Sequence, residues 1–396
     1  MSINSNKAYN NPVRYGPEMR ILIVGGGIAG LTFGGLLQQR GFRPTIVEQI
    51  PDYGNVGYIM VLWPSGSRIL KGLGLYRKLL DAGLPFSTYH VKNQQGEVLH
   101  SYSVKSITDK YGPMINIYRP ELINILRESV DPGSIRMGTT VEKIDQTGDE
   151  VNVTFSDGSQ GTFDLVVGCD GVRSKTRSLV FGDVPLSYSG MSGWSFWVKS
   201  SLMKTAHIAE YWGTGKFLGI WPTKGRLSVF TCIRSPEGVA DTLENRLNLI
   251  EEHFKDFGGI VPDILSDLED PNEVYHADYN DLRMDEWYRG RVVLVGDSAH
   301  AVLPTAGGGV SMAIESAAVL ADELTRTDSQ YMEHALEGYV ARRRSRVKRI
   351  QDQSRMMGKF AFADSRFISS IRNFVLKFYS NKLHLKYWDT MLKEPI

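Results

Sequence analysis

A glycine cluster near the beginning of the chain has the spacing of a nucleotide-binding turn. Gly25, Gly27 and Gly30 fit the pattern GxGxxG, and Ile28 and Ala29 fill its last two variable positions. In such a turn the first glycine allows a tight bend, the second lets the backbone approach a pyrophosphate, and the third lets the helix pack on the strand. Backbone amides at the start of the following helix then bind the phosphates. We expect these five residues to contact a dinucleotide.

The sequence on both sides of the cluster supports this interpretation. Arg20–Val24 is a largely apolar run, typical of a parallel strand buried on both faces. Thr45–Glu48 reads as the next strand, which completes a βαβ unit of about 30 residues. Glu48 lies eighteen residues after Gly30, where a carboxylate accepts hydrogen bonds from ribose hydroxyls and repels a 2′-phosphate. The spacing therefore favours FAD or NAD over NADP at this site, and the alternative is a purely structural glycine turn.

Two later segments place an acidic residue directly after a predicted buried strand. Asp170 follows Leu165–Cys169, and Gly296–Asp297 follows Arg291–Val295. Either aspartate alone could cap a helix after a strand. The second segment continues into a loop and a predicted helix start that contain Pro304, Gly307, Gly308, Gly309 and Val310.

The order and spacing of these motifs, from Arg20 to about Arg346, resemble the FAD-dependent monooxygenases of the aromatic hydroxylase (para-hydroxybenzoate hydroxylase-like) family. The resemblance implies that Asp297 holds the ribityl chain of FAD, and that the segment beginning at Asp170 serves both FAD and NAD(P)H. It also implies that the Gly307–Gly309 loop lies beside the isoalloxazine ring. Arg119, in Tyr-Arg-Pro-Glu-Leu, matches the family arginine that reaches FAD from a helix start; a surface charge is the alternative.

The resemblance also implies a reaction. NADPH or NADH would dock transiently as reductant, O₂ would add to the reduced flavin, and C4a-hydroperoxyflavin would transfer its distal OH to the substrate. A helix beginning near Gly309 would direct its positive end toward the N1–C2=O edge of the flavin and stabilise the anionic reduced form. We assign no catalytic side chain, because the flavin carries the chemistry. His300, close to Asp297, is interpreted as structural.

An aromatic segment is the candidate for the substrate site. Strand alternation places Phe217, Gly219 and Trp221 on one face, and Tyr211 precedes them in the same segment. Tyr58 stands where relatives have small residues near the flavin ring. Several phenol and purine hydroxylases of the family carry His or Arg where Phe217 stands, so we expect a mostly apolar ring substrate here. The alternative is that these aromatic side chains form only a domain core.

The expected fold is α/β, a Rossmann-like FAD-binding domain with an inserted, mostly antiparallel β-sheet substrate domain and C-terminal helices. Short strands rich in Tyr, Trp and Phe distinguish the insertion from the buried strands around it. The predicted division assigns 18–75, 101–184 and 277–340 to the FAD-binding domain, 76–100 and 185–276 to the substrate domain, and 341–396 to the C-terminal helices.

The composition excludes several other classes of protein. The 396 residues include 45 Lys and Arg against 44 Asp and Glu, so the net charge of +1 provides no overall field that would attract nucleic acid. Two cysteines cannot build a multi-cysteine metal site, and they favour a reducing compartment. The polar segment Met1–Pro17 predicts no signal peptide, and no apolar run approaches the ~20 residues of a membrane span. We expect a cytoplasmic protein whose partners are a small organic substrate and O₂, with no metal; the sequence indicates no oligomeric state.

The C-terminal part of the chain is basic. From Glu337 to Ile396, fourteen Lys or Arg residues stand against five acidic ones. We expect Phe367–Leu385 to be a helix packed across the two domains with a solvated basic face, which in relatives helps to close the substrate entrance. The alternative is an amphipathic helix on a membrane surface.

Three alternatives to hydroxylation or epoxidation stay open. The apolar Phe217 also fits inactivation of a polycyclic antibiotic, as in the related tetracycline-oxidising enzymes. A flavin-dependent halogenase would carry a WxWxIP motif and a lysine near the ring; the chain has Gly193-Trp194-Ser-Phe-Trp197 and Ile220-Trp221-Pro222 but no such motif. A non-catalytic flavin-binding regulatory protein would lose the glycine loop, which is present at Gly307–Gly309.

Overall fold

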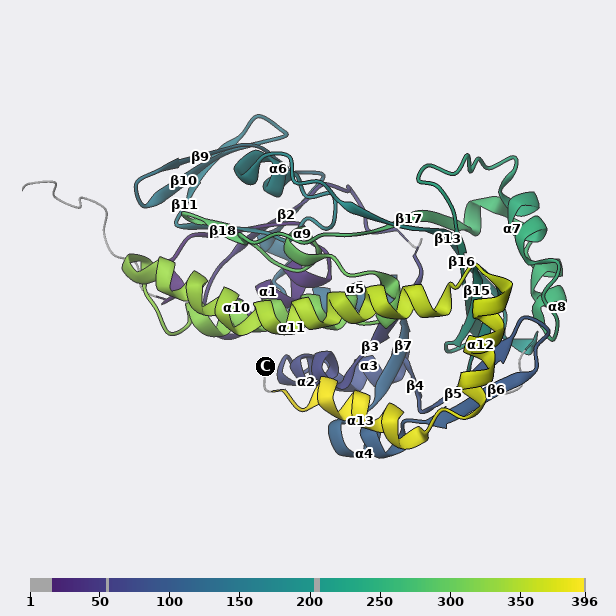
Figure 1. The fold of residues 1–396 in the computed structure, drawn as a ribbon. Coiled ribbons are helices and arrows are strands. Elements are labelled where there is room, and N and C mark those ends of the chain that lie inside the picture. Colours follow the sequence, from purple (N-terminus) through teal and green to yellow (C-terminus); the bar gives the residue numbers. More distant parts are fainter. Residues whose placement is uncertain (1–15, 55–56, 203–206, 395–396) are drawn as a thin grey trace, which may run out of the picture.

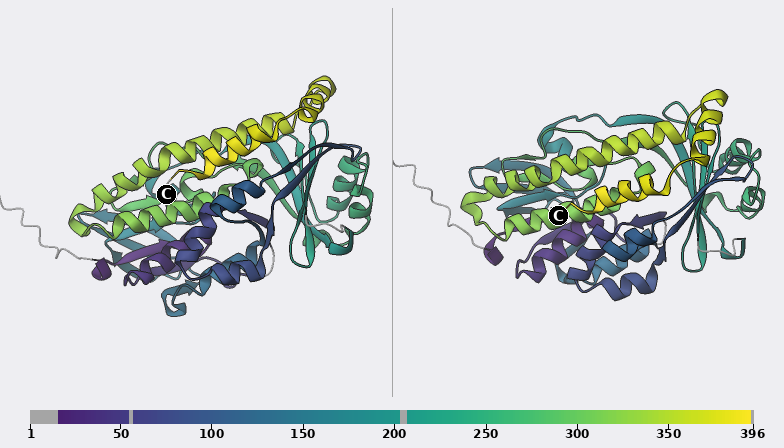
Figure 2. Two further views of the ribbon diagram at one scale, coloured as in Figure 1. Left: turned by 90° about the horizontal axis from the view of Figure 1, so that it is seen from below. Right: turned by 60° about the horizontal axis from the view of Figure 1, so that its bottom comes forward.

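The computed structural model describes residues 16–54, 57–202 and 207–394. Two large sheets lie toward opposite ends of an elongated molecule, and the long helix α11 (Met332–Ala361) runs beside both (Figure 1; Figure 2). Residues 1–15, most of the segment predicted to lack a signal peptide, lie outside the described residues. Within the described ranges, none of the helices combines the length and the apolar character that a membrane span requires. The expected α/β fold class is confirmed.

The first large sheet has six strands, which are, in spatial order, β18 (Tyr288–Arg289), β19 (Val292–Leu294), β12 (Leu165–Gly168), β1 (Ile21–Val24), β2 (Thr45–Glu48) and β8 (Ile135–Met137). β1 pairs in parallel with β12 and with β2, and β12 pairs in parallel with β19. The carboxyl ends of these strands therefore lie along one edge, where open α/β sheets bind their ligands.

Both faces of this sheet are covered. One face carries an antiparallel meander of β9 (Val141–Thr147), β10 (Glu150–Phe155) and β11 (Gln160–Phe163). The other face carries the helices α1 (Ile28–Gln39) and α10 (Gly309–Leu324). Along β1, Ile21 and Ile23 pack on the helical side, whereas Leu22 and Val24 pack against the meander. This burial on two faces explains why the strand reads as an unbroken apolar run.

The second large sheet has seven strands, which are, in spatial order, β17 (Tyr275–Asp281), β13 (Ser187–Lys199), β16 (Arg226–Arg234), β15 (Lys216–Pro222), β14 (Ile208–Trp212), β5 (Thr88–Asn93) and β6 (Val98–Ser103). Its pairs are antiparallel except for β14 with β5. The helices α7 (Arg246–Phe254) and α8 (Val261–Ser266) cover one face, where Ile250, Phe254 and Ile264 are fully buried. The opposite face is left to contact the rest of the molecule.

A small sheet of β3 (Ile59–Leu62), β7 (Met114–Tyr118) and β4 (Leu84–Phe86) lies between the two large ones (Figure 1). The neighbouring helices are α2 (Pro64–Gly72), α3 (Tyr76–Ala82), α4 (Lys105–Tyr111) and α5 (Arg119–Arg127). Short helices follow two strands of the six-stranded sheet, namely α6 (Lys175–Phe181) and α9 (Asp297–His300). The chain ends with α12 (Arg366–Lys377) and α13 (Asn381–Leu392).

The seven-stranded sheet draws on residues 88–103 and 187–281, so its limits lie near the predicted substrate domain without coinciding with it. Helix α3, which was expected in the substrate domain, contributes Leu79 to the core of the six-stranded sheet. The division into six segments stays a prediction.

The predicted single C-terminal helix is wrong, and its predicted solvated basic face is only part of the exposed surface. Phe367–Leu385 spans two helices, and α12 exposes apolar side chains beside Arg366 and Lys377: Phe367 is 74% exposed and Phe374 is 64% exposed. The buried residues of α12 include Arg372, which donates hydrogen bonds to the carbonyl oxygens of Ala361, Trp212 and Gly213 at 2.5, 3.1 and 3.0 Å. These three acceptors draw the basic side chain inward and turn the apolar face outward.

A buried ion cluster joins the helices α10, α11 and α13. Glu315, on α10, is fully buried and accepts hydrogen bonds from Arg343 at 2.8 Å and from Arg346 at 2.7 and 2.9 Å. Burial opposes ionisation of Glu315, but the two arginines of α11 hold its pKa below the usual value. Arg346 also donates to the carbonyl oxygen of Met391 at 2.6 Å. The cluster therefore fixes α11 on α10 and α13 on α11.

We expect Glu315→Gln to lower the free energy of unfolding by about 3–5 kcal/mol, because the buried guanidinium of Arg343 loses its counter-charge and that of Arg346 keeps only Glu394, 3.2 Å away. Glu323→Gln is the matched control: Glu323 bonds Arg342 near the surface of the same helix pair, and such pairs contribute about 1 kcal/mol or less. Urea unfolding of the FAD-loaded protein measures both. Equal losses for the two variants would contradict the assigned role.

Candidate active site

The glycine turn between β1 and α1 is tightly packed at its first and third glycines and open at its second. Gly25 has a φ of +105°, and a Cβ there would lie 2.5 Å from the carbonyl oxygen of Cys169. A Cβ on Gly30 would lie 1.9 Å from the carbonyl oxygen of Gly25. A Cβ on Gly27 would meet no atom within 4 Å. The backbone at Gly27, Ile28 and Ala29 therefore borders space that a phosphate can occupy.

Glu48 lies directly beside this turn. Its Oε2 accepts the Gly26 N–H at 2.7 Å, and its Oε1 accepts the Ile50 N–H at 3.1 Å. The Tyr53 hydroxyl donates to the carbonyl oxygen of Gly26 at 2.8 Å, and the Arg127 guanidinium lies over the Tyr53 ring. These contacts hold the half-buried carboxylate at the carboxyl end of β2, as the spacing from Gly30 predicts.

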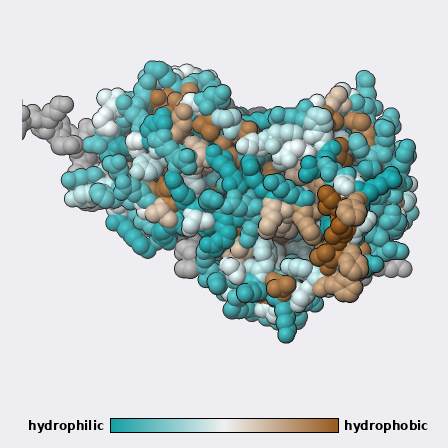
Figure 3. Space-filling model, in the orientation of Figure 1, coloured by the Kyte–Doolittle hydropathy of each residue, from teal (hydrophilic) through white to brown (hydrophobic). Residues whose placement is uncertain are grey.

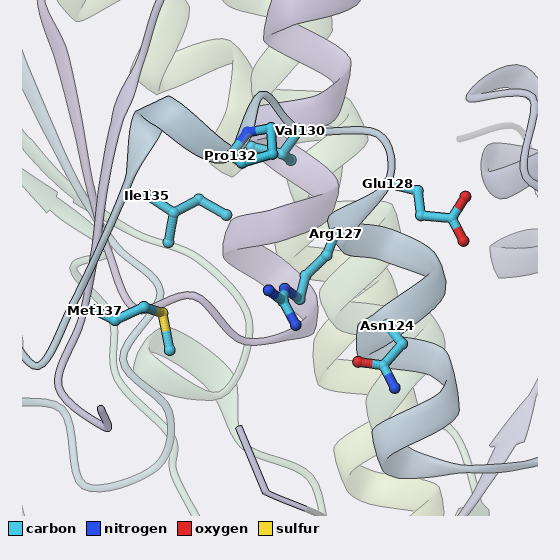
Figure 4. Close-up of a pocket in the computed structure, with 7 residues that line it drawn as sticks. All are labelled: Asn124, Arg127, Glu128, Val130, Pro132, Ile135 and Met137. Atoms are coloured by element: carbon cyan, nitrogen blue, oxygen red, sulfur yellow. The ribbon is translucent and has the colours of Figure 1, made fainter. Parts of the chain in front are cut away.

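A broad hollow of about 600 Å³ lies between α5 and β8, the strand that pairs with β2 (Figure 4). It is lined by residues of α5, of the turn after it and of β8, including Arg127, Ile135 and Met137. Met137 is the register partner of Glu48 across the β2–β8 pair. The hollow therefore continues the ligand-binding edge of the sheet outward from the glycine turn.

Asp297 reaches the same edge from β19. Gly296 has a φ of +72° and lies close to α10 and α1. A Cβ on Gly296 would lie 3.2 Å from the Cβ of Ala313 and 3.3 Å from the Cβ of Ala29. The Asp297 side chain is exposed although the residues on either side of it are buried. Its surroundings nonetheless limit hydration and raise the pKa of the carboxyl to about 6. Asp297 thus lies exposed at the starts of α1 and α10.

Asp170 makes different contacts from those expected of a ligand-binding carboxylate. Its Oδ1 accepts the Ser174 hydroxyl at 2.5 Å, and its Oδ2 accepts the Thr176 N–H at 2.8 Å. Both oxygens thus stabilise the turn and the start of α6, the capping role that such a residue often has after a strand. A direct contact between Asp170 and a cofactor stays a prediction.

The glycine loop before α10 is shaped by its surroundings. Gly307 is left-handed with a φ of +62°, and a Cβ on Gly308 would lie 2.8 Å from the ring of Trp63. Gly309 has open space beside it and begins α10, with Val310 next in the helix. Pro304 is exposed at the start of the loop. The amide end of a sixteen-residue helix therefore lies at the same edge of the sheet as Asp297.

A cavity of about 280 Å³, called the recess below, lies at the start of α5 and reaches the second sheet at Tyr275. It is lined by Gly57, Tyr58, Arg119 and Tyr275. Tyr58 and Tyr275 stack with 5.3 Å between ring centres, and Arg119 begins α5 with its N–H bonded to the Tyr58 carbonyl oxygen at 3.1 Å. Burial raises the pKa of Tyr58 to about 12, so its hydroxyl stays protonated. Tyr275 was missed by the sequence analysis, where it lay at an expected domain boundary.

The free face of the seven-stranded sheet is aromatic. Phe217 and Trp221 of β15 lie on it with 6.2 Å between ring centres, and Phe362 packs on Phe217. Gly219 lies between them, where a Cβ would be 2.2 Å from the Trp221 ring. The predicted common face of these residues is confirmed, and the glycine is required because the indole ring lies across it. Phe230 continues the aromatic surface on β16.

Tyr211 does not belong to this face. It is fully buried on the other side of the sheet, in the core under α7 and α8, and its hydroxyl accepts a hydrogen bond from Lys92 at 3.2 Å. Alternation along β14 explains the difference, since Ala209 and Tyr211 point one way and Glu210 and Trp212 the other. We therefore assign Tyr211 to the core and not to the substrate site.

Glu210 is the polar group on the aromatic face that the sequence analysis missed. One of its oxygens accepts the Trp212 Nε1–H at 3.0 Å, and no salt bridge of the described residues includes it. Burial raises the pKa of the carboxyl to about 7, although the bond from Trp212 favours the ionised form. Glu210 keeps some exposed surface, so a ligand on this face can reach it. Only the pairing of β14 with β15 reveals which way it points.

His300 takes no part in this site. It is buried against Ser316, whose hydroxyl lies 3.0 Å from His300 Nε2, and burial lowers the pKa of the imidazole to about 3. The ring is therefore neutral over the range in which enzymes usually work. Among the described residues, no cluster of three or more His, Cys, Asp or Glu side chains has the geometry to hold a metal ion.

An open glycine turn, a carboxylate at the end of β2 and a helix start beside a second carboxylate define the class as a dinucleotide-binding flavoprotein. The chain belongs to the FAD binding domain family, whose profile matches residues 18–354. It is 30% identical over 339 residues to the aurachin C monooxygenase/isomerase of Stigmatella aurantiaca, covering 84% of this chain and 86% of that protein. It is 29% identical over 366 residues to the 2-heptyl-3-hydroxy-4(1H)-quinolone synthase of Pseudomonas aeruginosa, covering 92% and 95%.

The fold also matches HpxO of Klebsiella pneumoniae, solved with FAD and uric acid. The TM-score is 0.89 at 24% sequence identity, over 96% of this chain and 99% of HpxO. At this identity the match shows the fold alone. The interpretation of the chain as an FAD-dependent monooxygenase is confirmed by its family and its relatives.

We expect Gly27→Val to fold normally but to bind FAD at least about tenfold more weakly, because the new side chain enters space that the protein leaves open. Gly72→Val, at the end of α2, is the matched control, since a Cβ there also meets no atom within 4 Å and lies away from the turn. Titration of the FAD-free proteins with FAD, followed by flavin fluorescence, measures the affinity. An unchanged FAD affinity for Gly27→Val would show that the open space is not the phosphate site.

Proposed function

We propose that the protein is an NAD(P)H-dependent monooxygenase that hydroxylates or epoxidises an apolar, ring-containing small molecule. The observation that carries this proposal is a recess lined by Tyr58 and Tyr275. Tyr58 lies within electrostatic range of Asp297 at the cofactor-binding edge, and both tyrosines lie within range of Tyr279, which stacks on Phe230 of the aromatic face. In the hydroxylation, NAD(P)H, a proton, O₂ and R–H give NAD(P)⁺, water and R–OH. Bound FAD supplies the electron transfer and the activation of O₂.

The residues of this chain fit FAD along its whole length. The backbone at Gly25–Gly30 would receive the pyrophosphate, Glu48 the adenosine ribose, and the hollow beside Met137 the adenine end. Asp297 would hold the ribityl hydroxyls. The amide end of α10 at Gly309 would face the part of the ring that becomes negative on reduction, and its positive potential favours that charge.

The substrate side is best suited to a flat, largely apolar ring system with one hydrogen-bond donor. Trp221, Phe217 and Phe230 provide apolar surface, and Glu210 provides an acceptor that no basic side chain of the described residues pairs with. A ring N–H or an acidic hydroxyl meets this need. The relative named as a 2-heptyl-3-hydroxy-4(1H)-quinolone synthase supports a bicyclic N–H heterocycle with an apolar substituent as the substrate class.

The direct test begins with the purified protein. It should be yellow, with the absorption spectrum of FAD, and should oxidise NADPH or NADH faster when an alkyl-4(1H)-quinolone is present. Product mass should rise by one oxygen atom, and ¹⁸O₂ should supply that atom. A colourless protein that stays without FAD after titration would remove the proposal, and so would NAD(P)H oxidation that no ring substrate stimulates.

The pKa of Glu210 gives a pH prediction. If the ionised carboxylate accepts the substrate N–H, kcat/KM should rise as the pH increases through about 7, because the raised pKa leaves Glu210 protonated below that value. Glu210→Gln should lose this rise and lower kcat/KM by about tenfold or more, as expected for loss of a hydrogen bond to a charged group.

Trp212→Phe is the matched variant for this prediction. It removes the N–H that stabilises the ionised Glu210, so the rise should move to higher pH while the carboxylate remains. FAD affinity should be unchanged in both variants. The wild type should bind an N-methylated substrate more weakly than the unmethylated one. Glu210→Gln should bind the two substrates equally well. A wild-type profile retained in Glu210→Gln would assign the titration to another group.

A further inference from the structure

Helix α12 carries an apolar surface that no other part of the described chain covers. It consists of Phe367, Ile368, Ile371, Phe374, Val375 and Phe378, which are 74, 53, 48, 64, 47 and 74% exposed. Figure 3 shows it as a brown patch at the end of the molecule that holds the seven-stranded sheet. Met356 and Phe360, exposed at the end of α11, continue it. Monomeric soluble proteins seldom expose a contiguous surface of this kind without a use for it.

The orientation of α12 is fixed by polar contacts. Arg372 points inward and donates to the carbonyl oxygens of Ala361, Trp212 and Gly213, and its guanidinium lies 5.5 Å from the centre of the Trp212 ring. Ser369, one turn earlier, donates to the carbonyl oxygen of Ala363 at 3.0 Å. Rotation of the helix to bury its phenylalanines would break all of these bonds. The apolar surface therefore faces outward in the ordinary folded state.

The chain segment that carries this surface is basic. Between Met356 and Lys386 the chain has six Lys or Arg residues and one acidic residue, Asp364. Arg372 is buried, whereas the other five basic residues are exposed: Lys359, Arg366, Lys377, Lys382 and Lys386. A helix with a bulky apolar face and flanking basic side chains lies in the plane of a lipid interface, where its apolar face enters the acyl boundary and its cations meet anionic headgroups.

The same charges argue against a second copy of the chain as the occupant. A symmetric contact through α12 would bring two sets of basic side chains together with little acidic charge between them. An anionic bilayer satisfies the apolar face and the cations at once. Because no helix in the described ranges meets the requirements of a membrane span, the contact is peripheral.

We propose that α12, with the end of α11, is a docking surface for the interface of an anionic phospholipid bilayer. Docking there places the seven-stranded sheet next to the lipid, because α12 packs on β6 and is bonded to the end of β14. The inference concerns lipid binding and does not depend on which ring compound is oxidised.

The test is co-sedimentation of the FAD-loaded, full-length protein with large unilamellar vesicles. Vesicles of phosphatidylcholine with about 30% phosphatidylglycerol should bind the wild type at least about tenfold more strongly than vesicles of pure phosphatidylcholine, and about 0.5 M salt should weaken the binding. Phe367→Ser combined with Phe374→Ser should lower binding at least about tenfold, as should Lys377→Glu combined with Lys382→Glu.

The matched control is Leu179→Ser combined with Leu243→Ser, two exposed apolar residues outside the surface, 38 and 50% exposed. It should bind vesicles as the wild type does. FAD content and thermal unfolding of each variant show that it has folded. Lack of wild-type binding to anionic vesicles would overturn the proposal, as would equal binding to both vesicle types. A concentration-dependent dimer that the Phe367 and Phe374 substitutions abolish, without vesicle binding, would assign the surface to a second copy instead.

Discussion

The packing of α10, α11 and α13 depends on the ion pairs of one buried carboxylate, that of Glu315. Two arginines of α11 bond to it, and one of them continues to the end of α13. Arg343 also donates to Ser316, whose hydroxyl contacts His300. A single polar chain therefore runs from the segment after Asp297 to the C-terminal helix. Because Glu315 and Gly309 share α10, the cluster also holds the helix end at the cofactor-binding edge in place.

The cofactor edge of the six-stranded sheet arises from close backbone packing. The backbone at Gly25 and Gly30 approaches its neighbours more closely than any side chain would permit, which places the start of α1 beside Gly296 and Asp297. These contacts bring together segments more than 260 residues apart in the sequence. The aromatic wall on the second sheet comes from a different source, namely alternation along β14 and β15. The recess lies between the cofactor edge of the first sheet and the aromatic face of the second.

The sequence predicted the parts whose signals are local. The glycine pattern, the spacing to Glu48 and the apolar strands before Asp170 and Asp297 each depend on residues close together in the sequence. The structure has the strands β1, β2, β12 and β19 at these positions. Tyr211 and Glu210 could not be assigned in this way, because the face that each occupies depends on strand pairing with residues elsewhere in the chain. The outward apolar face of α12 was missed because carbonyl groups more than 150 residues earlier hold Arg372 inside. Tertiary contacts decided these cases.

The length of α11 limits how the molecule can open. This continuous thirty-residue helix is bonded to β19 through Tyr339, to the glycine-loop segment through Ser354 and, just past its end, to β16 through Phe362. It spans roughly 45 Å as a stiff rod. Helix α11 therefore links the two large sheets. A hinge motion between the sheets would have to bend this helix or break its contacts with one of them. Exchange of substrate and product must therefore use smaller movements, of loops and side chains at the recess, instead of domain opening.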